Sequence, residues 1–204
     1  DAFVKEEIQV LVGTQMVVKG LDFKNVLLVG VINADHVLNF PDFRAHERSY
    51  QMLCQVAGRA GRSDKKGRVL MQTYQPEHPT LKQVLDHDFE NLFATQKKER
   101  LRYHYPPYFR MIRITLKSKQ YDTINLAADW FANVVKQSYN GSVLGPAFPA
   151  VSRIRNQYQK QILIKIDHEL SASALKKLLL KTHKSFQAIA SFKSIRINFD
   201  VDPY

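Results

Sequence analysis

The chain has 204 residues, 45% of them hydrophobic, and a formal net charge of +11. A single cysteine, Cys54, excludes an internal disulfide framework and is typical of a cytosolic protein. No apolar run approaches the ~20 residues that span a bilayer, so no membrane segment is expected. The length allows one or two domains with hydrophobic cores, and we expect two.

The positive charge lies in the second half of the chain. Residues 1–96 hold 11 Lys and Arg against 12 Asp and Glu, whereas residues 97–204 hold 19 against 7, a net charge of +12. Such an excess of cations is typical of a domain that binds a polyanion, above all nucleic acid. A basic surface that only keeps the domain soluble is the alternative.

The first half of the chain has the pattern of an α/β domain. Continuous apolar, β-branched runs at 8–13, 26–33 and 68–74 predict strands that are buried on both faces of a parallel sheet. Tyr50, Leu53, Cys54 and Ala57 recur at helical spacing between the last two. Residues 77–102 predict one long amphipathic helix, which ends before Pro106 and Pro107 because proline cannot continue a helix. We therefore place one domain at 1–103 and a second at 104–204.

The second half alternates strands and helices. We expect strands at 110–118, 160–166 and 194–203, a short extended piece at 142–146, and helices at 121–138 and 170–186, the latter capped by a serine. This β-α-β-β-α-β order is that of a ferredoxin-like split βαβ sandwich, in which the helices cover one face of the sheet.

The other face of this sheet is predicted to be basic. The alternation directs isoleucines toward the helices and places Arg113, Lys117, Lys165 and Arg196 on the opposite face. The loop 150–160 adds four more predicted DNA-binding residues, because cations beside an aromatic ring suit strand backbone and base stacking: Arg153, Arg155, Tyr158 and Lys160. An exposed hairpin with solubilising charges is the other reading of that loop.

Two motifs in the first half point to phosphate chemistry. GTQMVVKGLDF (13–23) follows a predicted strand, where open α/β sheets present ligand-binding loops. QVAGRAGR (55–62) holds Arg59 and Arg62 among small residues that permit a close approach, and a guanidinium matches phosphate oxygens. No G-x-x-x-x-G-K-[ST] run and no DExx box occur, so this chain alone is not expected to hydrolyse ATP.

These motifs resemble those of a helicase family. GTQMVVKGLDF is similar to motif V and QVAGRAGR to motif VI of superfamily 2. Together with NADHVLNFPDFRAHER (33–48), LGP (144–146) and DVDP (200–203), they resemble the primosomal protein N′ family of replication-restart helicases over the full length. The resemblance implies the end of the second RecA-like helicase lobe, truncated in this chain, followed by a C-terminal DNA-binding domain with a ribosomal S10-like fold.

The resemblance also implies residue roles. Arg59 and Arg62 would be the catalytic arginines that reach the γ-phosphate across the cleft. Gln55, Gly20 and Asp22 would face the nucleotide, and Thr14, Gln15 and Lys19 would contact DNA.

For the whole protein, the resemblance implies an ATP-dependent DNA helicase that recognises stalled or abandoned replication forks and starts primosome assembly in the bacterial cytoplasm, at the nucleoid. Its cofactors would be ATP and Mg²⁺, with zinc in a cysteine-rich region outside this chain; no CxxC occurs here, so no metal is expected. Partners would be branched and single-stranded DNA, single-stranded-DNA-binding protein and primosome proteins. We also expect a truncated lobe to self-associate through its exposed apolar surface.

Two alternatives remain at this point. The second domain could be a docking module without catalytic activity, with four lysines of the 170–186 helix receiving an acidic peptide such as the tail of single-stranded-DNA-binding protein: Lys176, Lys177, Lys181 and Lys184. The chain could also belong to a different translocase that carries motifs V and VI.

Overall fold

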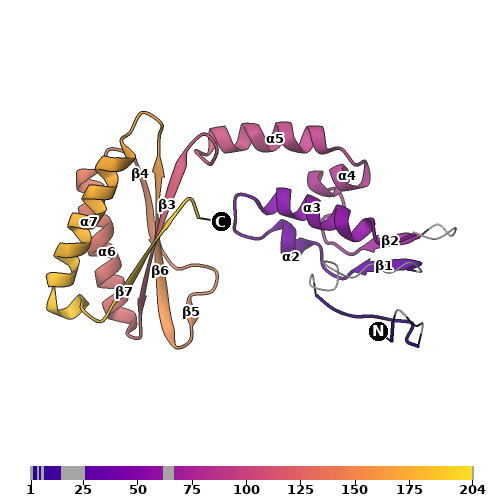
Figure 1. The fold of residues 1–204 in the computed structure, drawn as a ribbon, viewed down its shortest axis with the longest axis horizontal. Helices are drawn as coiled ribbons and strands as arrows, with labels where there is room; N and C mark the ends of the chain where they lie inside the picture. The colour runs from indigo at the N-terminus through magenta and orange to yellow at the C-terminus, as the bar shows by residue number, and fades with distance from the viewer. Residues whose placement is uncertain (1, 4, 6, 15–25, 62–66, 204) are drawn as a thin grey trace. The chain divides into compact units, whose positions relative to one another are not determined.

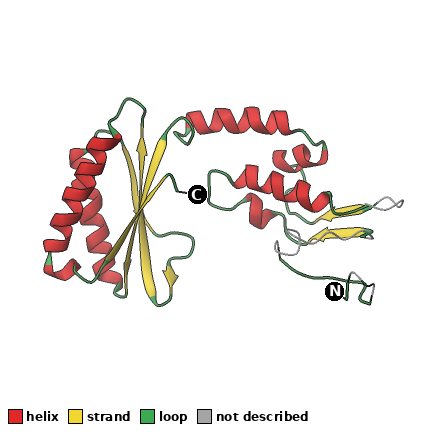
Figure 2. Ribbon diagram, in the orientation of Figure 1, coloured by secondary structure: helices red, strands yellow, loops and turns green. Residues whose placement is uncertain are grey.

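The computed structural model describes residues 2, 3, 5, 7–14, 26–61 and 67–203. The chain divides into two units, Asp1–Lys97 and Lys98–Tyr204. The division falls within one helix, a few residues before the predicted boundary at 103/104. Figure 1 labels the helices and strands of both units, and Figure 2 colours them by type.

The first unit contains a small parallel sheet. Strand β1 (Leu28–Val31) pairs in parallel with β2 (Arg68–Met71), with Leu28 opposite Arg68 and Val31 opposite Met71. Between them lie the short helix α2 (Asp35–Leu38) and helix α3 (Ala45–Ala57). The predicted order of strand, helix and strand is confirmed here, because a parallel pair needs such a crossover connection.

The prediction of strands buried on both faces is wrong for the described residues. Leu28 and Leu70 are 56% and 61% exposed, and only the other face of the pair packs on the core. Residues 7–14 form no strand, and Val10 and Val12 are more than 70% exposed. An apolar run favours burial, but a strand also needs a pairing strand and a covering layer, which no described residue supplies to this segment.

The predicted long helix is two helices, α4 (Pro79–Leu85) and α5 (Phe89–Arg102). His87 adopts a positive φ of 54°, and the carboxylate of Asp88 accepts the amide N–H of Asn91 at 3.1 Å. Aspartate at this position caps a new helix, so the chain turns although the apolar spacing continues. As a result, the predicted apolar stripe is divided: Leu81, Val84 and Leu92 are buried, whereas Leu85, Phe89 and Phe93 are exposed.

His78 makes α4 sensitive to pH. Its Nδ1 accepts the amide N–H of Thr80 at 3.2 Å, and the ring of His46 lies 5.3 Å away. Burial, and then the charge of His46, lower the pKa of His78, while Asp35 raises it. A histidine whose pKa is lower in the folded state stabilises that state fully above its unfolded pKa of ~6.5 and loses this contribution as the pH falls below it.

We therefore expect α4 to loosen on acidification from pH 7 to 5, because a protonated Nδ1 cannot accept from Thr80. The measurement is the urea dependence of the α4 amide NMR signals at each pH. A His78→Asn variant, which retains a capping acceptor without a titrating ring, should lose most of this pH dependence. An equal pH dependence in both proteins would contradict the role of His78.

The second unit is a sheet covered by two helices on one face. The sheet contains β3 (Arg110–Ser118), β4 (Ser142–Ala147), β6 (Gln157–Ile166) and β7 (Arg196–Val201), and the two-residue strand β5 (Arg153–Ile154) pairs with β6. The strand order is β4-β6-β3-β7, and these pairs are antiparallel. Helices α6 (Tyr121–Ser138) and α7 (Ala172–Ala188) cover one face (Figure 1), and a 3-10 turn (Ala190–Phe192) precedes β7. The predicted split βαβ arrangement is confirmed.

The core of this unit lies between the sheet and the two helices. Ile114 on β3 and Phe131 on α6 are both fully buried, and the Phe131 ring lies 5.9 Å from the ring of Phe186. Trp130 packs on Phe186 and Phe192. The predicted serine cap is also confirmed, because the Ser171 hydroxyl accepts the amide N–H of Ala174 at 3.2 Å.

Two of the motif segments have structural roles here. Gly145, in LGP, has a φ of 90° where the register of β4 shifts, and a Cβ there would lie 2.7 Å from the carbonyl oxygen of Gln161. Asp202, in DVDP, accepts from the Arg110 guanidinium at 2.9 Å and from the Met111 amide N–H at 3.1 Å. It therefore joins the end of the chain to the first strand of the unit.

Candidate nucleic-acid interface

The sheet face that the helices leave uncovered carries the polar residues of the strands. On β3 these are Arg113, Thr115 and Lys117, which alternate with buried Ile112, Ile114 and Leu116. In the register of the sheet, Lys117 lies opposite Gln159 on β6 and Arg196 on β7. The predicted placement of Arg113, Lys117 and Arg196 on this face is confirmed.

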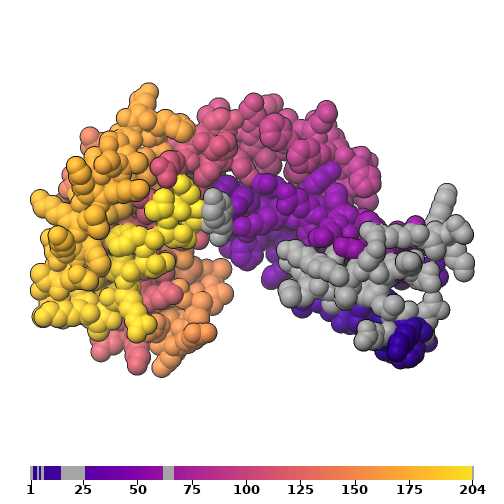
Figure 3. Space-filling model, viewed as in Figure 1, coloured from indigo at the N-terminus to yellow at the C-terminus, as the bar shows by residue number. Residues whose placement is uncertain are grey.

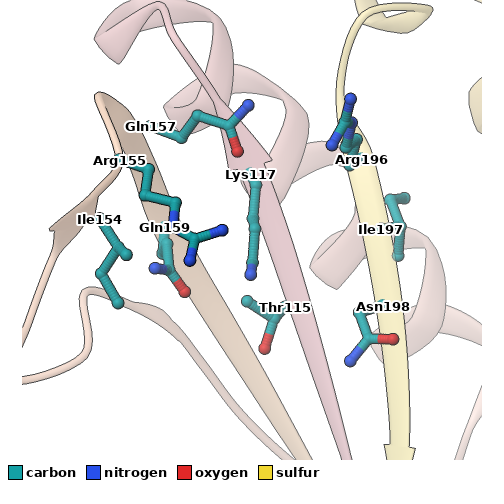
Figure 4. Close-up of a pocket in the computed structure, with 9 residues that line it drawn as sticks. All are labelled: Thr115, Lys117, Ile154, Arg155, Gln157, Gln159, Arg196, Ile197 and Asn198. Atoms are coloured by element: carbon teal, nitrogen blue, oxygen red, sulfur yellow. The ribbon is translucent and has the colours of Figure 1, made fainter.

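One end of this face is hollowed. The hollow has a volume of about 440 Å³ and is lined by Thr115, Lys117, Ile154, Arg155, Gln157, Gln159, Arg196, Ile197 and Asn198. Figure 4 shows Lys117 on the central strand, with Arg155 on one side of it and Arg196 on the other. Three cations from three separate segments therefore surround one space.

A tight turn places Arg155 at the hollow. Arg155 and Asn156 have φ values of 49° and 60° and connect β5 directly to β6. Two successive positive φ values are those of a type I′ hairpin turn, which favours asparagine. The turn brings the preceding strand back onto β6, with Ile154 opposite Gln157, so that the hairpin extends the sheet beside Lys117.

The side chains that line the hollow are suited to binding an anion. Its described lining contains three cations and four neutral polar side chains but no Asp, Glu, His or Cys. Cations position phosphates, while amide side chains can both donate to and accept from base edges. The lining therefore suits a segment of nucleic acid backbone and offers no nucleophile or general base.

Lys165 lies on the predicted face of the sheet, but it is buried there and is not part of the exposed basic surface that was expected. Lys165 is only 8% exposed, its Nζ donates to the Tyr103 carbonyl oxygen at 2.5 Å, and it lies 3.8 Å from the centroid of the Tyr105 ring. Burial lowers the pKa of Lys165. The alternation identified its face correctly, but it could not show that the segment before β3 covers that end.

We expect Lys165→Ala to affect stability and not DNA binding. Loss of the hydrogen bond to Tyr103 and of the contact with Tyr105 should lower the free energy of unfolding of the second unit by about 1–3 kcal/mol. Urea titration followed by tryptophan fluorescence measures the effect on stability. The affinity for DNA, measured at low salt without urea, shows whether binding changes. A weakening of DNA binding as large as that caused by Lys117→Ala would contradict this assignment.

Tyr158 and Lys160 lie on the opposite face from the hollow, because they alternate along β6 with Gln157 and Gln159, which line it. The strand begins at Gln157 and not at 160 as predicted. Tyr158 is half-buried against the core, and the Arg153 guanidinium lies 4.9 Å from the centroid of its ring. The Nζ of Lys160 lies 5.0 Å from the centroid of the Phe148 ring. The loop expected at 150–160 is thus a hairpin whose side chains contribute to two different surfaces.

Sequence reasoning missed the polar partners of the cations in the hollow. Gln157, Gln159 and Asn198 line it beside Lys117 and Arg196. Extending the predicted strand from 160 back to 157, with the same alternation, would have placed Gln157 and Gln159 on the face of Lys117.

Only part of the predicted nucleotide surface falls within the described residues. Gln55 is exposed on α3, and Arg59, half-buried, follows the end of this helix at Gly58. Gly61 donates its amide N–H to the Val26 carbonyl oxygen and so connects this turn to the start of β1. Thr14 is exposed, and the other predicted positions lie outside the described residues: Gln15, Lys19, Gly20, Asp22 and Arg62. Their roles remain predictions.

In the described part of the chain, no group of three or more His, Cys, Asp or Glu side chains is arranged to hold a metal ion. None of the described helices is both long and apolar enough to cross a membrane.

The second unit is thus a split βαβ domain with a cation-lined hollow on the uncovered face of its sheet. Residues 101–204 match the family described as primosomal protein N C-terminal domain, and the chain belongs to that family. This confirms the family predicted from the motifs.

Curated relatives match along the whole chain. It is 38% identical over 205 residues to replication restart protein PriA of Bacillus subtilis, covering 100% of this chain and 25% of the relative. It is 36% identical to the protein of the same name from Synechocystis, also covering 100% of this chain and 24% of the relative. The corresponding protein of Treponema pallidum is 35% identical over 206 residues, with 100% and 30% covered. The chain therefore spans about a quarter of the length of these relatives.

Proposed function

We propose that this chain is part of an ATP-dependent superfamily 2 DNA helicase that recognises stalled or abandoned replication forks and starts primosome assembly. The relatives named for replication restart and the two helicase motifs support this proposal. In this proposal the second unit binds DNA through the hollow of Lys117, Arg155 and Arg196. The observation that carries this part is the convergence of three cations in one hollow of the uncovered sheet face, whose described lining contains no carboxylate.

We further propose that the first unit is the end of a RecA-like lobe. The parallel pair β1–β2 with a helix between its strands supports this assignment. Gln55 and Arg59 fit contact with a phosphate, since an amide and a guanidinium both donate hydrogen bonds. Neither residue is a carboxylate, the side chain that usually holds Mg²⁺ in proteins. ATP and Mg²⁺ would therefore be held mainly by the rest of the longer protein, as would zinc.

In that longer protein, Arg59 and Arg62 would stabilise the negative charge that develops on the γ-phosphate. Arginines in this role accelerate phosphoryl transfer by about 10³- to 10⁵-fold. The described chain would then contribute one side of the nucleotide switch and one DNA-binding module, without catalysing hydrolysis alone.

Fluorescence anisotropy of the whole 204-residue chain with branched, duplex and single-stranded DNA, over a salt series, tests the DNA-binding part. We expect binding that favours branched DNA and weakens with salt. If each of the three cations neutralises one phosphate, they contribute about −2.7 to the slope of log K against log salt. Absence of binding at low salt would overturn the proposal for this unit.

One observation favours a second role for the same unit. Lys176, Lys177, Lys181 and Lys184 are all exposed on α7, and this helix contains no acidic residue to pair with them. An acidic peptide, such as the tail of single-stranded-DNA-binding protein, fits such a surface by charge. A peptide that binds the chain, and loses affinity on Lys181→Ala while DNA affinity is unchanged, would support a separate docking site.

A further inference from the structure

A cluster of three aromatic rings lies at the other side of the β5–β6 hairpin. Tyr121, the first residue of α6, stacks on Phe148 with 5.6 Å between ring centroids and 7° between ring planes. The ring of Tyr158 meets Tyr121 edge-on at 5.4 Å. Although two rings hold it in place, Tyr121 remains 50% exposed, and Phe148 is 37% exposed.

Cations border this cluster. The Nζ of Lys160 lies 5.0 Å from the centroid of the Phe148 ring, and the Arg153 guanidinium lies 4.9 Å from that of Tyr158. Rings that only close the edge of the core do not require a half-exposed tyrosine whose two neighbouring rings each contact a cation. A fixed, accessible ring beside positive charge is the combination that binds unpaired bases and their phosphates.

The hairpin separates this cluster from the hollow. Arg153 lies opposite Tyr158 in the register of β5 and β6, and both belong to the aromatic cluster. The next pair, Ile154 opposite Gln157, lines the hollow. These two neighbouring residue pairs of the hairpin thus direct their side chains to opposite faces, one toward the aromatic cluster and the other toward the hollow. In Figure 3 the orange atoms of this hairpin project at the lower edge of the second unit.

We propose that Tyr121, supported by Phe148, is a stacking site for an unpaired base of single-stranded nucleic acid. The hollow then holds backbone phosphates on one side of the hairpin while an unpaired strand passes on the other, so the hairpin divides two strands where a duplex opens. This inference rests on the proposed DNA binding and adds a contact for the single-stranded arm that the hollow does not provide.

A forked DNA with 5-iodouracil in its unpaired arm tests this site in the whole chain. Irradiation should crosslink the arm to the peptide that contains Tyr121 or Phe148, identified by mass spectrometry. Tyr121→Leu, which removes the ring but retains an apolar side chain, should abolish this crosslink and weaken single-strand binding about 5- to 100-fold. Tyr121→Phe, which retains the ring, should behave as the unmodified chain.

The controls separate this inference from the proposed function. Duplex affinity and the tryptophan fluorescence of the folded unit should be the same in both Tyr121 variants. If Tyr121→Leu binds single strands like the unmodified chain, or crosslinks fall elsewhere, the stacking site is wrong and the hollow can still bind DNA. If the unmodified chain binds no DNA at low salt, the stacking site and the proposed function both fail.

Discussion

Replacing Lys117, Arg155 and Arg196 together with alanine is expected to weaken DNA binding by about 100-fold at low salt. This value assumes that each cation contributes about 1 kcal/mol through its phosphate contact. Because the three lost cations no longer displace counterions, the slope of log K against log salt should become shallower by about 2.7. Anisotropy titrations of both proteins at 50 and 200 mM salt measure the change in affinity and the change in slope.

A charge-matched control decides whether position matters. Changing Lys176, Lys177 and Lys181 on α7 to alanine removes the same three charges from an exposed helix outside the hollow. If the hollow is the DNA site, this control should retain most of the affinity for duplex DNA. Equal weakening in the two triple variants would mean that net charge, and not the hollow, accounts for binding.

Phe131→Ala is expected to lower the free energy of unfolding of the second unit by about 3–5 kcal/mol, the usual cost of deleting a buried aromatic ring. Phe131 is fully buried, and its ring meets those of Phe186 and Phe199 at 5.9 and 6.2 Å. Urea titration followed by fluorescence measures the effect selectively, because the sole tryptophan of the chain, Trp130, packs in this same unit.

Leu180→Ala is the matched control for this measurement. Leu180 lies on α7 and is 62% exposed, so its truncation should change the free energy of unfolding by less than about 0.5 kcal/mol. If Phe131→Ala costs no more than Leu180→Ala, the core of the unit does not have the packing described here.

The fold of the second unit could be predicted from sequence because its signals are local. The strand at 110–118 and the helix at 121–138 occur as predicted, since alternation and helical spacing report which residues are buried. The break between α4 and α5 was missed because the apolar spacing continues through it, while a single capping aspartate at 88 decides the turn.

The candidate site was predictable only in part. The alternation along a strand indicates which face of the sheet a side chain lies on, but not which other segments cover it. Arg113, Lys117 and Arg196 lie where the alternation places them. Lys165 is covered by residues before β3. Tyr158 and Lys160 lie on the face of Ile162 and Ile164, because the alternation of β6 extends through the segment that was predicted as a loop. A contact between distant segments determines the first outcome, and the true extent of one strand determines the second.

The hydrogen bonds that Asp202 accepts from Arg110 and Met111 affect when this unit can fold during translation. Asp202 and Arg110 lie 92 residues apart, and the central strand β3 pairs with β6 and β7, both of which are synthesised long after it. A strand can be buried in a core only when neighbouring strands pair with its backbone N–H and C=O groups, because these groups then lose their hydrogen bonds to water. The nascent β3 can pair with β6 first, but its other edge has no partner until β7 leaves the exit tunnel. The unit therefore completes its sheet only when its last strand has been made, and truncation before Asp202 would remove the closing contact.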